Sequence, residues 1–134
     1  MAHHEAQPSP PSTASCEAGV RDAANQTLVV VAERELAGAL AEQERPARGM
    51  YVHPSRAEIA AFERAVHAIC REAHRLDLRA EELLIGIKQA WFQLAPVRMN
   101  YLGERDGDVL REVVSSSIEV FFESRDAEAR HPPQ

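Results

Sequence analysis

The sequence predicts an all-α fold, a small helical bundle of three to four helices with a disordered N-terminal tail. Three observations predict it. The 134 residues are 45% apolar, which suffices for one domain with its own core. In four segments, large apolar side chains recur at spacings of three and four residues, the period of an amphipathic helix. Residues 1–23 are rich in Pro, Ser and Ala and hold few large apolar side chains, so they cannot offset their ordering entropy.

The helical domain is predicted over residues 24–125, and its first helix over residues 25–45. The apolar face of that helix consists of Leu28, Val29, Ala32, Leu36, Ala39 and Leu40. Because residues 29–31 are three β-branched valines, the start of this segment could instead be extended. Pro46 ends the helix, and the Pro/Gly linker that follows leaves two arrangements open. The helix either completes a four-helix bundle or docks on a partner.

The second helix is predicted over residues 55–76. Ser55 and Glu58 have the spacing of a capping box, in which each side chain satisfies the other residue's free backbone N–H. The apolar face of the helix consists of Ile59, Phe62, Val66, Ile69, Ala73 and Leu76.

Two further helices follow a tight break at residues 77–79. The third is predicted over residues 80–94, and its main apolar face consists of Leu83, Leu84, Ile87, Ala90, Trp91 and Leu94. Pro96 ends it, and residues 96–107 are expected to form a loop. The fourth helix is predicted over residues 108–123, and residues 126–134 are expected to fray.

Charge and composition exclude several classes of protein. The net charge of −6 argues against nucleic-acid binding, because affinity for a duplex comes mainly from neutralised phosphates. No segment approaches the ~20 apolar residues of a membrane span, and the N-terminus lacks the pattern of a secretory signal. Cys16 and Cys70 lie in dissimilar settings and do not suggest a disulfide. We therefore expect a cytoplasmic protein with reduced thiols. Lys88 is the only lysine, a bias typical of GC-rich bacterial genomes.

One cluster has the chemistry of a metal site. His67, Cys70 and His74 lie at helical spacing on one flank of the second helix, and Glu63 lies one turn earlier. Imidazole and thiolate bind zinc and other transition metals, so a metal- or haem-binding protein is the alternative functional hypothesis. Three donors on one helix still need a fourth ligand from elsewhere. The favoured interpretation is that Cys70 packs as a small apolar residue and that the protein has no metal or other cofactor.

Enzymatic motifs are missing from the sequence. It contains no Gly-rich phosphate loop, no Gly-x-Ser-x-Gly elbow and no Cys-x-x-Cys pair. Glu81 and Glu82 are adjacent and so point to different sides of a helix, which argues against a carboxylate dyad. The same two carboxylates would face phosphates if the third helix read DNA. We expect a protein that is not an enzyme.

The most informative feature is a surplus of apolar side chains. Ile85 and Phe92 lie seven residues apart, away from the main apolar face of the third helix, with Lys88 between them. On the fourth helix apolar side chains span about 200°, whereas a surface helix needs a face only a little wider than ~100°. The surplus fits either a helix central to its own bundle or a second buried face. The sequence thus predicts a non-enzymatic interaction or regulatory module, homodimeric or bound to another protein, with a contact surface of Ile85, Phe92, Ile118 and Phe122.

Overall fold

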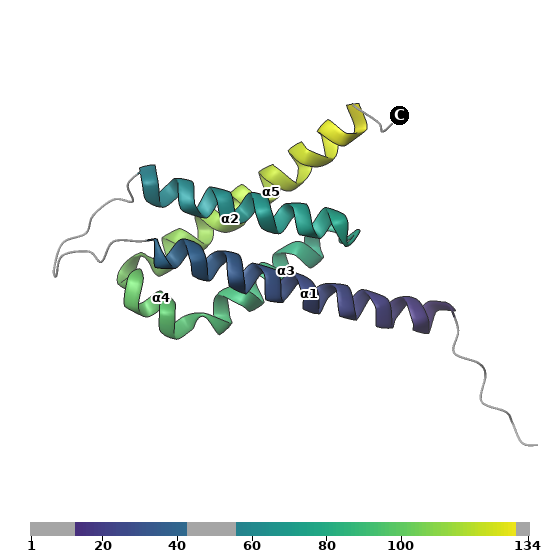
Figure 1. Ribbon diagram of the computed structural model, residues 1–134, viewed down its shortest axis with the longest axis horizontal. Coiled ribbons are helices and arrows are strands. Elements are labelled where there is room, and N and C mark those ends of the chain that lie inside the picture. The colour runs from purple at the N-terminus through teal and green to yellow at the C-terminus, as the bar shows by residue number, and fades with distance from the viewer. Residues whose placement is uncertain (1–12, 43–55, 131–134) are drawn as a thin grey trace, which may run out of the picture.

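A computed structural model describes residues 13–42 and 56–130 of the chain (Figure 1). Within these ranges the all-α prediction is confirmed, because they contain five α-helices, one short 3-10 helix and no strand. The helix count exceeds the expected three to four by one short helix. In chain order the elements are α1 (Thr13–Ala41), α2 (Arg56–Arg75), α3 (Ala80–Gln93), α4 (Ala95–Tyr101), η1 (Gly103–Arg105) and α5 (Asp106–Arg130).

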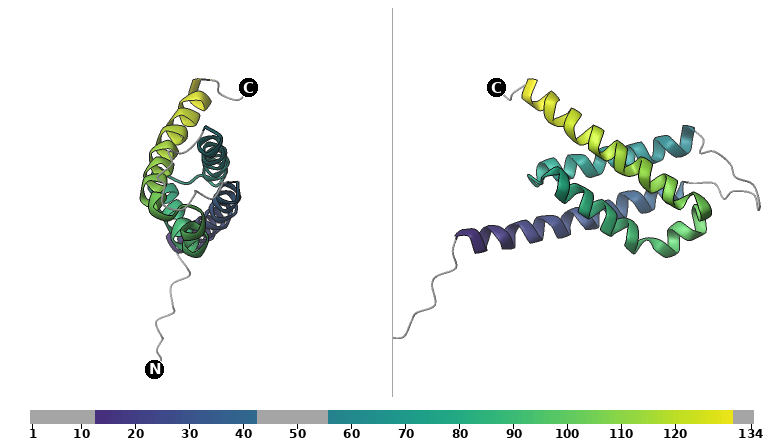
Figure 2. Two further views of the ribbon diagram at one scale, coloured as in Figure 1. Left: turned by 90° about the vertical axis from the view of Figure 1, so that its left-hand side faces the viewer. Right: turned by 180° about the vertical axis from the view of Figure 1, so that it is seen from behind.

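The four long helices form a bundle of two layers. α1 packs on α2 and α3, and α5 packs on the same two helices from the other side. α1 and α2 make one layer and α3 and α5 the other, as the two views of Figure 2 show. The four long helices alternate in direction along the chain, so α2 and α5 run in the same direction (Figure 1). The N-terminal part of α1 and the C-terminal part of α5 extend beyond the bundle at the same end.

The core is aliphatic and comes mainly from the apolar faces that the sequence predicts. All six apolar residues named for the first helix are buried, so that helix belongs to the bundle, and its three valines are helical. The central residues of the other two faces are also buried, whereas Ile59 at the start of α2 is exposed. The buried members on α2 and α3 are Phe62, Val66, Ile69, Ala73, Leu83, Ile87, Ala90 and Trp91.

The first helix begins earlier than predicted. Residues 13–23, assigned to the disordered tail, are part of α1, which starts at Thr13 rather than at residue 25. Around Arg21 the helix is held by tertiary contacts, because Arg21 and Asn25 both reach Glu82 at the start of α3. Residues 1–12 and 43–45 lie outside the described residues. So does Ser55 of the predicted capping box, and α2 begins at Arg56.

The predicted break between α2 and α3 is a C-terminal cap of defined geometry. Asp77 has a left-handed backbone, with φ of 56°. Its N–H donates to the carbonyl of His74, and the N–H of Leu78 donates to the carbonyl of Ala73. These are the two bonds of a Schellman motif, which is completed by burial of the apolar residue that follows. Leu78 fills that place.

The predicted loop at residues 96–107 is largely helical, so that prediction is wrong. Pro96 falls in the first turn of α4, where the missing N–H has no helical partner to lose and the fixed φ suits a helix start. The proline therefore ends α3 and also begins α4. α5 is longer than the predicted 108–123 and includes residues 126–130, which were expected to fray.

Candidate interaction surface

The outward side of α3 carries large apolar side chains. Its inward side is formed by five buried residues: Leu83, Gly86, Ile87, Ala90 and Trp91. Ile85 and Phe92 lie opposite them, 64% and 80% exposed, with exposed Lys88 between them. We call Ile85, Lys88 and Phe92 the α3 stripe. Met99 of α4 is also 64% exposed and continues the seven-residue spacing, a signal that sequence reasoning missed.

The rotation of α3 about its own axis is fixed by contact with α1. Gly86 faces α1, and a Cβ built on it would lie 3.0 Å from Cδ2 of Leu28. Leu28 is fully buried and has little room to move. A side chain at position 86 would require Leu28 to shift, so this close approach of the two helices favours glycine. Turning α3 to bury Ile85 or Phe92 would lose that contact. The exposure of the α3 stripe is therefore a consequence of the packing.

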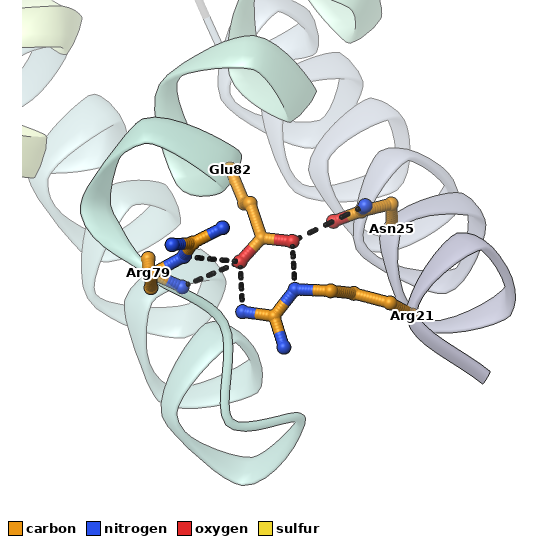
Figure 3. Close-up of polar contacts among 4 residues, drawn as sticks. All are labelled: Arg21, Asn25, Arg79 and Glu82. Atoms are coloured by element: carbon orange, nitrogen blue, oxygen red, sulfur yellow. Dashed lines mark hydrogen bonds and ion pairs between the residues drawn. The ribbon is translucent and has the colours of Figure 1, made fainter. Parts of the chain in front are cut away.

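The start of α3 is tied to α1 by a polar cluster (Figure 3). The carboxylate of Glu82 accepts bonds from Nε and Nη2 of Arg21 at 2.7 and 2.6 Å, and from the amide of Asn25 at 3.4 Å. It also accepts the backbone N–H of Arg79 at 2.9 Å, which caps the helix. Burial opposes ionisation of Glu82, but the bonds from Arg21, Arg79 and Asn25 outweigh it and lower its pKa to about 2. The position of Glu82 at the start of a helix is the sequence signal for this role.

The end of α3 is tied to α5 through Arg98 of α4, a second cluster that the sequence did not reveal. The Arg98 side chain is buried, its Nε donates to the carbonyl oxygen of Trp91 at 2.7 Å, and its Nη1 pairs with Asp106. The guanidinium carbon lies 5.2 Å from the centre of the Trp91 ring, within the range of a cation–π contact. The Arg98 guanidinium thus holds α4 against α3 and α5. Contacts at both ends of α3 now fix its position: Glu82 at the start and Arg98 at the end.

α5 divides its apolar residues between the core and the surface. Val113, Ser117 and Phe121 are buried at intervals of four residues, and the Ser117 hydroxyl donates to the carbonyl of Val113 at 2.7 Å. Ile118 and Phe122, next to the last two, are 39% and 46% exposed. The ring of Phe122 packs edge-on against Phe121, with centroids 5.5 Å apart.

The wide apolar arc on α5 is thus divided between residues that pack on the core and residues that lie on the surface. Leu110 and Val120 are partly buried against the core, as expected of a helix with two neighbours. Ile118 and Phe122 remain exposed and are flanked by Glu119 and Glu123, which are also exposed. We call Ile118, Glu119, Phe122 and Glu123 the α5 stripe. All four residues that the sequence predicts as a contact surface thus lie on the outside of the single chain.

The three residues of the predicted metal cluster have separate environments. Cys70 is buried, its thiol donates to the carbonyl of Ser117 at 3.6 Å, and burial raises its pKa to about 12. His74 is stacked on Phe121 with centroids 4.4 Å apart, and its Nε2 lies 3.1 Å from the carbonyl oxygen of that residue. His67 is exposed. In the part of the chain that the structure describes, no group of three His, Cys, Asp or Glu side chains could hold a metal ion.

Comparison with known proteins yields no relative for this chain. No protein-family model, no curated protein and no solved structure gives a match. Among residues 13–42 and 56–130, no helix combines the length and apolar character that a membrane span requires.

Proposed function

We propose that this protein is a non-enzymatic interaction module that works as a homodimer, with the α3 and α5 stripes as its contact surface. The observation that carries the proposal is the pair Ile85 and Phe92, two large apolar side chains on one outward line of a helix whose rotation is fixed. Single exposed apolar residues are ordinary on protein surfaces. Large ones aligned on one face are typical of association surfaces, where aromatic side chains contribute most of the affinity.

The chemistry of the remaining reactive groups supports a non-catalytic role. A nucleophilic cysteine needs a lowered pKa and access to solvent, whereas Cys70 is buried and its raised pKa keeps it protonated at neutral pH. His74 packs against Phe121 as part of the α2–α5 contact. Within residues 13–42 and 56–130, no group of side chains supports the metal- or haem-binding alternative. A buried free thiol at Cys70 agrees with the reducing cytoplasm that we propose as the compartment.

Oligomeric state is the direct test of this proposal. Sedimentation equilibrium of the full chain from about 1 to 300 μM should fit a monomer–dimer equilibrium, since surfaces of modest size give dissociation constants near the micromolar range. Native mass spectrometry should show the dimer mass without a metal adduct. A monomer throughout this range would overturn the proposal, and a stoichiometric metal would restore the alternative.

A matched pair of variants assigns the dimer to this surface. Phe92→Ser should weaken dimerisation by roughly tenfold or more, because loss of an interface aromatic usually costs more than 1–2 kcal/mol. Val30→Ser is the control, since Val30 is 60% exposed but lies on α1, outside both stripes. It should leave the dimer unchanged. Equal effects of the two substitutions would show that the contact lies elsewhere.

A further inference from the structure

The two stripes carry opposite charge around similar apolar centres. Residues 83–103 contain no Asp or Glu, in a chain whose net charge is −6. Of the two cations in this range, Arg98 is buried and paired with Asp106. Lys88 is therefore the one exposed charge within residues 83–103, all of which the structure describes, and it lies between Ile85 and Phe92.

The α5 stripe is the complement of the α3 stripe. Its two apolar residues are flanked by two exposed carboxylates, Glu119 and Glu123. An isoleucine and a phenylalanine thus stand beside a cation on α3 and beside anions on α5. In a desolvated contact, like charges that meet are strongly unfavourable, whereas opposite charges set the choice of partner surface.

This charge pattern discriminates among the ways in which two copies could meet. If α3 packed on α3 of a second copy, the two Lys88 ammonium groups would lie close together with no carboxylate from residues 83–103 between them. If α5 packed on α5, Glu119 and Glu123 would face their own copies. Of these three arrangements, the crossed one places apolar side chains against apolar side chains and Lys88 against carboxylates.

Building on the dimer proposed above, we infer that α3 of one copy packs on α5 of the second copy, with Lys88 of each paired to Glu119 or Glu123 of the other. A two-fold axis makes this contact occur twice, because every contact in such a dimer is repeated by symmetry. α3 and α5 are neighbours in one layer of the bundle, as such a contact requires (Figure 2).

The available area also favours the use of both stripes. Large side chains present roughly 150–250 Å² when fully exposed, so the α3 stripe alone offers on the order of 300 Å² of apolar surface. A stable interface buries about 800 Å² per partner. One stripe falls well short of this value, whereas the two together with their flanking polar side chains approach it.

Charge reversal tests the crossed pairing. Lys88→Glu should weaken the dimer by about tenfold or more in low salt, and so should the double substitution Glu119→Lys/Glu123→Lys, because each creates two like-charged contacts. Mixing the two variant proteins in equal amounts should restore wild-type affinity as a heterodimer, since both of its contacts are complementary. The chain that carries all three substitutions should dimerise with itself. These differences should shrink in 1 M salt.

Two control variants on α2 test whether the effect belongs to the two stripes. Arg71→Glu and Glu63→Lys make comparable charge changes on exposed positions of α2 and should leave the dissociation constant unchanged. Circular dichroism spectra should be unaltered for all variants, and so should thermal melts at concentrations where the chain is monomeric, because every substituted position is exposed. If only one of the two charge reversals has an effect, the α3 and α5 stripes are not partners, and this inference is wrong while the dimer stands. If no charge reversal has an effect, the inference is likewise overturned. A monomeric wild-type protein would overturn the proposed function itself.

Discussion

The two sides of α3 have similar residues and opposite surroundings. Ile87 is fully buried, whereas Ile85, two positions earlier, is 64% exposed. Trp91 is sealed beneath Arg98, whereas its neighbour Phe92 is the most exposed large apolar residue that the structure describes. The helix propensities of these residues do not distinguish the two sides. What distinguishes them is the neighbour that each side meets.

The difference teaches that burial on this helix is decided by a few positions that fix its rotation. Gly86 sets the inward direction by admitting Leu28 of α1. Glu82 fixes the first turn through Arg21 and the backbone of Arg79. Once these contacts form, one side of the apolar sequence is in the core and the other is on the surface.

The largest expected effect contrasts the two isoleucines. Ile87→Ala should lower the free energy of unfolding by about 2–5 kcal/mol, because it removes buried methyl groups and leaves a cavity. Ile85→Ala should change it by less than about 0.5 kcal/mol, since the side chain is exposed and alanine favours helix. Urea unfolding, at concentrations low enough to keep the chain monomeric, measures both. Similar losses for the two variants would mean that Ile85 is buried within the chain.

The next effect contrasts the two adjacent glutamates at the start of α3. Glu82→Gln should destabilise the protein by about 1–3 kcal/mol at neutral pH, because it removes the charge that Arg21 binds. Glu81→Gln is the control, since Glu81 is exposed, and it should have almost no effect. Thermal melts of the two variants at pH 7 make the comparison.

Glu82 also predicts a pH dependence. Its pKa is lowered from the ordinary 4.5 to about 2 in the folded state, so its contribution to stability is present above pH 4.5 and is lost as the pH falls to about 2. The wild type should therefore lose its advantage over Glu82→Gln across that interval. A difference between the two proteins that stays constant from pH 5 to pH 2 would argue against the ion pair with Arg21.

The smallest effect concerns the turn that leads into α3. Asp77→Gly should raise the free energy of unfolding by about 0.5–1 kcal/mol, because glycine adopts the left-handed backbone without the steric penalty of a Cβ. Asp77→Ala keeps the Cβ in the same conformation and should not stabilise the protein. The melting temperatures of the two variants decide the point. A glycine variant that melts below the wild type would mean that the carboxylate of Asp77 contributes more than its backbone costs.

Sequence reasoning succeeded where helical periodicity alone decides the outcome. The six apolar residues named for the 25–45 segment are all buried, and the break at residues 77–79 is the turn between α2 and α3. It failed at element ends. The sequence places Arg21 in a polar tail, because its partner Glu82 lies 61 residues away along the chain. The sequence predicts that Pro96 ends a helix, but it does not show that Arg98 holds a further helix through Trp91 and Asp106.

The sequence by itself determined that this chain is helical and which face of each helix is apolar, because both follow from the spacing of side chains along a single helix. It also marked Ile85, Phe92, Ile118 and Phe122 as surplus to one narrow face. Only the tertiary structure decided that these four lie outside while Leu110 and Val120 lie partly inside. That choice depends on which neighbouring helix approaches and how closely, and a one-dimensional pattern does not contain this information.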